Sequence, residues 1–387
     1  MPSKPGYPEA LEAAWLRHAL RITRAGQPRL AVERLEKAAG SLSDAFTTGR
    51  DPSFAGYSHD RRALAAYGLF FFPRAYARTQ CVMDEVRPHI REPEGEQPMR
   101  LLDLGAGTGA AGLAVAHVLS EWFPERPLHL EMIDQAEAGL ERARELFAAG
   151  RALWPRATLR DQRADARTHE NERPSDIIIA SFAVNEWMEN QPDEALLEWV
   201  RRQWNALRPG GCLIIIEPAL RFTVARMERL RDAWAASSVG RIIAPCPHHQ
   251  ACPMLAQKRG WCHEVREWDV PASLRMINRR LHRDVHLLKY SMLVLQKTGR
   301  ADEGSPWMRL VSPVAREKGK YVVHGCAADG NLHRCEWLTR HLTPEQKTFT
   351  ETLRRGNRVH MPAGERLGDG RTERLAGPPE LISHEHP

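Results

Sequence analysis

The 387-residue sequence has no apolar run that approaches the ~18 consecutive residues of a transmembrane helix, so no membrane span is expected. Its first residues show neither an apolar signal core nor an Arg/Ser-rich amphipathic presequence. A cytoplasmic protein without a membrane partner is therefore expected. The apolar fraction of 42% is high enough for a buried core, which argues against a wholly disordered chain.

Lysine is scarce, with 8 residues against 47 arginines, and the net charge of +6 hides a strong asymmetry. Residues 101–200 carry 9 basic and 18 acidic side chains, whereas residues 201–300 carry 18 basic and 7 acidic ones. A basic block of this size suits a phosphate-rich partner such as nucleic acid. The alternative is an ordinary solvated surface in an arginine-rich chain.

Cysteines are few, and their number is odd, which argues against a disulfide framework in a chain without a secretion signal. Two of the seven, Cys81 and Cys212, are isolated in the sequence. Cys246, Cys252 and Cys262 fall within 17 residues, and Cys326 and Cys335 follow later. Clustered thiols in a reducing compartment point to a metal centre.

Hydrophobic periodicity divides the chain into parts of different character. Apolar residues at three- and four-residue steps predict an N-terminal helical domain, in which Pro73 starts or kinks a helix. Alternating strands and helices then predict a Rossmann-like, mostly parallel α/β sheet. The expected domains are residues 1–95 (helical), 96–300 (α/β, with a cysteine-rich metal-cluster insertion at about 241–270), 301–340 (a small β appendage) and 341–387 (a polar, largely disordered tail).

A glycine turn directly follows the first expected strand and opens a helix, in the sequence DLGAGTG. Such a turn leaves room for a ligand against the N-terminus of the helix. An acidic residue at the end of the next strand can accept hydrogen bonds from ribose hydroxyls, and another in the loop after the third strand can meet an adenine amine. The predicted cofactor-binding residues are Asp103, Gly105, Gly107, Gly109, Asp134 and Asp165.

DLGAGTG resembles the S-adenosylmethionine (SAM) site of class I methyltransferases. The segment after the fourth strand lacks the prolines of the loop that holds exocyclic base amines in such enzymes. Asn185 and Glu186 there could orient a methyl acceptor, or they could equally cap the next helix. Cys212 starts a buried strand and is expected to be a core thiol rather than a nucleophile.

The first three clustered cysteines have the spacing C-x5-C-x9-C, which fits zinc ribbons and fingers poorly, since those separate a ligand pair by about two to four residues. A [4Fe–4S] cluster needs four thiolates and tolerates a remote fourth ligand. We expect Cys326 to be that ligand, with Cys335 in reserve. Zinc remains the alternative, and His248, His249 and His263 could complete such a site. A loop histidine beside cysteines more often lies next to a metal site or on the surface than ligates the metal, so these three are left out of the expected ligands.

Taken together, these stretches resemble the methyltransferase-like family associated with the small ribosomal subunit, which has bacterial and mitochondrial members. The resemblance covers roughly residues 60–335, and the cysteine-rich stretch is its most specific part. It implies cluster ligation by Cys246, Cys252, Cys262 and Cys326, a SAM site at the glycine turn, and docking on small-subunit rRNA.

The leading hypothesis is therefore a SAM-binding, iron–sulfur-containing protein that acts on the small ribosomal subunit, with rRNA methylation as its activity and a monomeric free state. The alternatives are a non-catalytic assembly factor, and a small-molecule or protein methyltransferase with structural zinc.

A basic stripe on a helix after the last of the three clustered cysteines offers candidate contacts with phosphate groups. Its members are Arg275, Arg279, Arg280 and Arg283.

Overall fold

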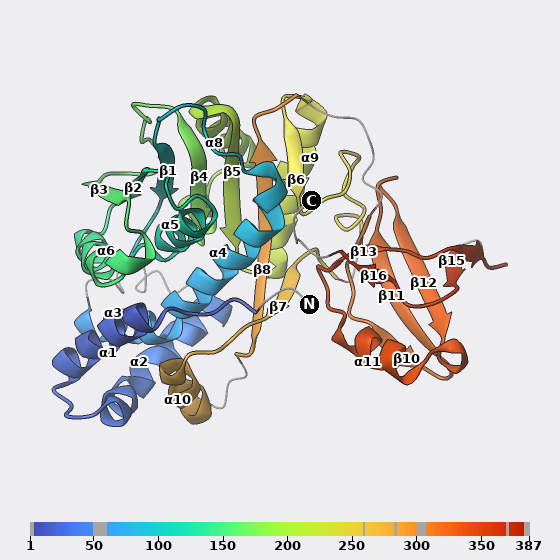
Figure 1. Cartoon of the computed structure of the whole chain (residues 1–387), viewed down its shortest axis with the longest axis horizontal. Coiled ribbons are helices and arrows are strands. Elements are labelled where there is room, and N and C mark those ends of the chain that lie inside the picture. Colours follow the sequence, from blue (N-terminus) through green and yellow to red (C-terminus); the bar gives the residue numbers. More distant parts are fainter. Residues whose placement is uncertain are drawn as a thin grey trace.

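Two β-sheets lie beside each other in the chain, each with its own core (Figure 1). The computed structural model describes residues 4–48, 60–257, 260–281, 285–299, 307–368 and 371–382. In that part of the chain, no helix combines the length and apolar character needed to cross a membrane.

Four helices precede the first strand: α1 (Glu9–Thr23), α2 (Pro28–Thr48), α3 (Arg61–Phe70) and α4 (Phe72–Val86). Asp60 caps α3, because its side chain accepts hydrogen bonds from the amides of Arg62 and Ala63. Pro73 lies in the first turn of α4, so the sequence prediction that it starts or kinks a helix is confirmed. Trp15 lies against Gly68, where an added Cβ would come within 1.9 Å of the indole, so α1 and α3 pack closely.

The first sheet has eight strands in the order β3-β2-β1-β4-β5-β8-β6, with β7 paired to β8. β8 runs antiparallel to β5, as in the class I methyltransferase fold that the sequence predicts. The strands are β1 (Met99–Leu104), β2 (Leu128–Asp134), β3 (Ala157–Arg163), β4 (Ser175–Ser181), β5 (Leu207–Glu217), β6 (Arg241–Ala244), β7 (Glu264–Glu267) and β8 (Leu287–Gln296).

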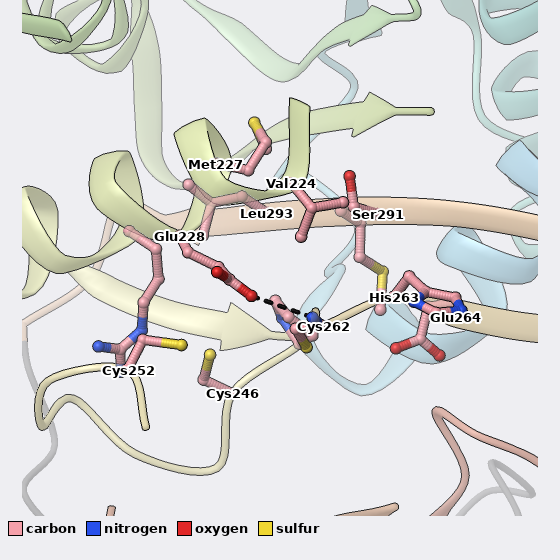
Figure 2. A pocket seen from close by; sticks show the side chains of 13 residues that line it. Val224, Met227, Glu228, Cys246, Cys252, Cys262, His263, Glu264, Ser291 and Leu293 are labelled. Carbon is pink, nitrogen blue, oxygen red and sulfur yellow. Dashed lines mark hydrogen bonds between the residues drawn. The ribbon is translucent and has the colours of Figure 1, made fainter. Parts of the chain in front are cut away.

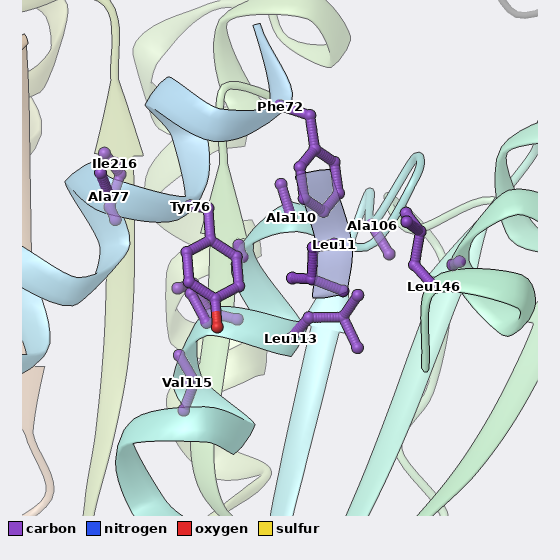
Figure 3. Close-up of a cluster of buried hydrophobic side chains, with 14 of the residues drawn as sticks. Leu11, Phe72, Tyr76, Ala77, Ala106, Ala110, Leu113, Val115, Leu146 and Ile216 are labelled. Atoms are coloured by element: carbon purple, nitrogen blue, oxygen red, sulfur yellow. The ribbon is translucent and has the colours of Figure 1, made fainter. Parts of the chain in front are cut away.

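Helices cover both faces of this sheet, because alternate residues of its strands enter two different cores. Ile214 and Ile216 of β5 join the core of the N-terminal helices, which also holds Tyr76 (Figure 3). Leu213 and Ile215 join a second core on the opposite face. The remaining helices of this region are α5 (Ala110–Trp122), α6 (Glu137–Ala149), α7 (Val184–Trp187), α8 (Asp193–Asn205), α9 (Arg221–Ser237) and α10 (Ala272–Leu281), with the 3-10 turns η2 (Arg87–His89) and η3 (Arg151–Leu153).

The second sheet also has eight strands, and we call residues 307–382 the β module. Its order is β14-β15-β12-β11-β9-β13-β16, with β10 paired to β11. Its elements are β9 (Met308–Leu310), β10 (Ala315–Glu317), β11 (Lys320–Cys326), β12 (Leu332–Leu338), η4 (Thr339–His341), α11 (Pro344–Thr352), β13 (Arg358–His360), β14 (Gly364–Arg366), β15 (Thr372–Leu375) and β16 (Glu380–Leu381).

The expectation of a largely disordered tail at residues 341–387 is wrong for the residues that the structure describes. Residues 344–381 contain α11 and four strands, and these extend the sheet of the expected appendage. The strands of the tail have only two to four residues each. They form by pairing with the edges of β9 and β12, so their own composition gives little sign of them.

A buried arginine–glutamate network joins the two sheets and α4. Arg309 of β9 donates to Glu264 of β7 at 2.7 Å and also pairs with Glu85 of α4. Arg266 pairs with Glu264 at 2.5 Å. The side chains of Arg309, Glu264 and Glu85 are only 2%, 1% and 3% exposed. Burial alone would raise the pKa of Glu85, but Arg309 and Arg266 bring it below its ordinary value.

Replacing Arg309 with methionine is expected to lower the free energy of unfolding by about 3–5 kcal/mol, because it leaves two buried carboxylates short of a partner. Urea unfolding at neutral pH measures the change. Arg316→Met is the control, since that side chain is 74% exposed and lies 3.8 Å from the exposed carboxylate of Glu351; it should cost at most about 0.5 kcal/mol. Equal losses for the two variants would contradict the role given to the network.

Candidate functional site

The glycine turn lies between β1 and α5, where the sequence analysis places a cofactor. Gly105, Gly107 and Gly109 have φ values of 72°, 53° and 82°, a left-handed conformation that favours glycine. Asp103 is buried, and its Oδ2 accepts a hydrogen bond from the amide of Gly112 at 2.7 Å. Its Oδ1 is buried and has no hydrogen-bond partner among the described residues. Burial raises the pKa of this carboxyl to about 7.

Asp134 ends β2 beside this turn and supports it. Its Oδ2 accepts from the amide of Gly107 at 2.8 Å, and its Oδ1 accepts from the amide of Ala136 at 2.7 Å. Each carboxylate oxygen retains capacity for a further donor, such as a hydroxyl. The structure therefore brings Asp134 next to the glycines, as the sequence pattern predicts.

Asp165 lies in the loop after β3, and its carboxylate is held by a neighbouring cation. Arg167 donates to it from Nη2 at 2.6 Å and from Nε at 3.0 Å. These hydrogen bonds lower the pKa of Asp165. Its predicted contact with an adenine amine stays a prediction.

Trp187 lies directly on the glycine turn, a feature that the sequence did not reveal. A Cβ added to Gly105 would lie 2.2 Å from Cζ2 of Trp187 and 2.7 Å from Cβ of Ala183. The backbone of Phe182, directly after β4, has a φ of 59°, a left-handed conformation that is uncommon for a residue other than glycine. The glycine turn offers a cofactor the unpaired Oδ1 of Asp103 and close approach to the backbone. Any ligand placed over Gly105, however, has to contact or displace the indole of Trp187.

The two candidate catalytic residues belong to the short helix α7. The amide of Asn185 donates to Oε1 of Glu217, a buried residue at the end of β5, at 3.3 Å. Glu186 is exposed, and its amide donates to the carbonyl of Ala183 at 3.0 Å. Both follow β4 at the carboxyl edge of the sheet, where ligands of α/β folds bind. Their catalytic role stays a prediction.

Three of the clustered cysteines line one small pocket, together with side chains of α9 and β8 (Figure 2). Cys246, Cys252 and Cys262 come from the loop between β6 and β7. Cys326 of β11 packs against Cys252 and Cys262 in a common buried group, and its Sγ lies 3.2 Å from Nε2 of His248. The structure therefore brings four thiols together from the first sheet and the β module.

Cys335, the reserve candidate, lies elsewhere. It is fully buried in the core of the β module, in the same hydrophobic group as Trp337. Of the two candidates for a fourth ligand, only Cys326 packs with the clustered cysteines. Cys212 is buried in β5, as expected for a core thiol.

No metal is established at the four thiols. Within the described ranges, no group of three or more His, Cys, Asp or Glu side chains is arranged to hold a metal ion. The pocket that Cys246, Cys252 and Cys262 line with side chains of α9 and β8 measures about 30 Å³. Burial raises the pKa of Cys252 to about 12 and that of Cys262 well above its ordinary value, so a metal would have to displace thiol protons.

Helix α9 holds the cysteine loop in place with one of its faces. Glu228 accepts a hydrogen bond from the amide of Cys262 at 3.0 Å (Figure 2). Asp232 accepts from the amide of Cys252 at 2.9 Å. Arg231 donates to the carbonyl of His248 at 2.5 Å and is itself buried. Residues at these spacings share one side of a helix, but the sequence did not show that this side faces the cysteines.

The predicted basic stripe on α10 is only partly available to a partner. Arg275 and Arg279 are exposed. Arg280 instead binds Glu33 and Glu36 of α2, each at 2.8 Å, and so fastens α10 to the N-terminal helices. The prediction for Arg280 as a phosphate contact is corrected accordingly, and Arg283 lies outside the described residues.

Comparison with known proteins matches the chain to a protein family. The model of the family described as "Mitochondrial small ribosomal subunit Rsm22" matches residues 61–350. A human protein, "Ribosome assembly protein METTL17, mitochondrial", is 23% identical over 257 residues, which are 63% of this chain and 51% of that protein. The chain thus spans about half the length of this relative.

Solved methyltransferase structures show a distant likeness. One, described as a class I SAM-dependent methyltransferase from Listeria monocytogenes, is 13% identical, with a TM-score of 0.39 over 77% of this chain and 90% of that one. Another, from Geobacter sulfurreducens in complex with S-adenosyl-L-homocysteine, is 15% identical, with a TM-score of 0.32 over 56% and 90%.

Proposed function

The chain belongs to the Rsm22 family, whose description names the mitochondrial small ribosomal subunit. We therefore propose that the protein binds the small ribosomal subunit and acts in its assembly. The observation that carries this proposal is the extent of the match. Residues 61–350 include the glycine turn, the four converging cysteines and most of the β module. The relative named as a ribosome assembly protein supports the same role. The basic block at residues 201–300 suits a contact with rRNA.

SAM is the cofactor that we propose for the glycine turn. Asp103 would receive its ammonium group, Gly105, Gly107 and Gly109 would lie beneath it, and Asp134 would accept its ribose hydroxyls. The unpaired, buried Oδ1 of Asp103 is the observation that fits, because a cationic group placed there would gain a hydrogen bond. When bound, SAM supplies an activated methyl group.

A [4Fe–4S] cluster is the group that we propose for Cys246, Cys252, Cys262 and Cys326. Four converging thiols suit iron–sulfur chemistry, and His248 at 3.2 Å from Cys326 is placed to interact with its sulfur. A cluster bound here would link the β6–β7 loop to β11, with zinc as the alternative metal.

Methyl transfer to rRNA is a second candidate function. Asn185 beside Glu217, at the carboxyl edge of β4 and β5, is the observation that favours it. The indole of Trp187 on Gly105 favours a scaffold, in which the cofactor shapes the protein without reacting. A small-molecule or protein methyltransferase with structural zinc is the remaining alternative, and a cytoplasmic location stays a prediction.

Co-sedimentation tests the ribosomal role. The full chain should pellet with purified small subunits at low salt and should be released as salt rises from about 50 to 200 mM, because phosphate contacts are lost with counterion competition. Radiolabelled SAM in the same samples shows whether the rRNA becomes methylated. Failure to pellet with subunits or their assembly intermediates at any salt would overturn the proposal, whereas pelleting without label would select the scaffold.

Cysteine variants test the cluster. Anaerobically purified protein should be brown and contain about four iron and four sulfide ions per chain. Cys326→Ala should lose most of the iron, since it removes one of four ligands. Cys335→Ala is the matched control from the same module and should keep it, because Cys335 packs in a different core. Stoichiometric zinc without iron, or equal iron in both variants, would contradict this assignment.

A further inference from the structure

A second cavity is lined by side chains of α1 and α6. These two helices lie on the face of the first sheet that the N-terminal helices cover (Figure 1). Its volume is about 250 Å³, far more than the roughly 10–15 Å³ that a cavity needs to hold one water. It shares no lining residue with the cysteine pocket. The cavity is lined by Ala14, Arg17, His18, Arg21, Arg142, Glu145 and Ala149.

Two residues of the cavity lining, His18 and Arg142, carry buried donors without partners. Nδ1 of His18 lies 2.6 Å from Nη2 of Arg142 and 3.2 Å from Nη2 of Arg21. A guanidinium can only donate, so Nδ1 is the acceptor and the ring proton is on Nε2. Within the described part of the chain, Nε2 of His18 and Nε of Arg142 are buried and have no hydrogen-bond partner. Both residues are more than nine-tenths buried.

The charge of the cavity is unbalanced. Three guanidinium groups line it, and the only carboxylate in the lining, Glu145, binds Nη1 of Arg142 at 2.5 Å. His18 adds no positive charge at neutral pH, since burial and then Arg142 and Arg21 lower its pKa to about 4. Buried donors beside a surplus of cations are stabilised by a bound anion.

We propose that this cavity binds a phosphate group. Arg142 and His18 would donate from their buried donor groups, and the exposed Arg17 and Arg21 would close on the outer oxygens. Guanidinium groups bind phosphate oxygens in pairs, and several donors converging on one point suit a tetrahedral anion with at least three acceptor oxygens. The phosphate could belong to an RNA backbone or to a free phosphorylated compound, and the chemistry of the site is the same for both.

Calorimetric titration of the full chain with inorganic phosphate, at constant ionic strength in chloride, tests the site. Arg17→Gln combined with Arg21→Gln should weaken binding by about tenfold or more, because two charge-assisted contacts are lost. The matched control is Arg61→Gln with Arg62→Gln, two exposed arginines at the start of α3, and it should bind like the wild type. Arg142→Lys keeps the inner charge but not the guanidinium fork, and should also weaken binding.

Titration with a short single-stranded RNA identifies the source of the phosphate. If the Arg17/Arg21 variant loses affinity for RNA as well as phosphate, the site holds an RNA backbone. If it loses phosphate alone, the ligand is a free phosphorylated compound. Phosphate binding without any RNA binding by the wild type supports the cavity and counts against the proposed ribosomal role. Wild-type protein that does not bind phosphate, or an Arg17/Arg21 variant that binds it equally well, would overturn the inference.

Discussion

The buried arginine–glutamate network is the constraint on which the arrangement of this protein depends. Arg309 enters a region with almost no water, and it remains charged there because Glu264 and Glu85 approach it from two other elements. Breaking any of these pairs would leave a buried charge without a partner. The three elements β7, β9 and α4 are therefore held in one relative position. The β module is consequently tied to the first sheet and to α4 at this point, and further bonds, such as those of Arg354 to Glu267 and of Arg355 to the carbonyl of Trp261, join the module to the same region.

That point also sets the position of the fourth cysteine. In the β9–β11 ladder, Cys326 lies opposite Arg309, and Glu264 follows Cys262 by two residues. The ion pair between Arg309 and Glu264 therefore brings Cys262 and Cys326 into the same region from opposite sides. Helix α9 completes the arrangement by holding the amides of Cys252 and Cys262. A metal cluster proposed for these thiols would reinforce a junction that the side chains already form.

Features that depend on local sequence were predicted well. The strand–turn–helix at Gly105 and the carboxylate of Asp134 at the end of β2 each follow from periodicity or from residues that are neighbours in the chain. The grouping of Cys326 with the remote cysteines was expected from the need of a cluster for a fourth thiolate and was also implied by the resemblance to a family, and the structure places Cys326 beside them.

Features that depend on distant partners were missed. Strands β13 to β16 form only on the edges of an existing sheet, and their short polar runs resemble a disordered tail. Arg280 was predicted to be a free surface cation, because its partners Glu33 and Glu36 belong to a different helix that is distant in the sequence. The contact of Trp187 with Gly105 could not be predicted from the sequence, because the position of this side chain depends on the backbone conformation of the turn after β4.

The central claim is that the cysteines and the arginine–glutamate network form one junction between the two sheets. Hydrogen exchange of the protein before and after a chelator removes the proposed iron–sulfur cluster tests it directly. Removing iron should deprotect the amides of β9 and of β11 near Cys326, while β1 and β2, which lie away from the junction, keep their protection. Unchanged protection of β11 after the iron has been removed would contradict the account.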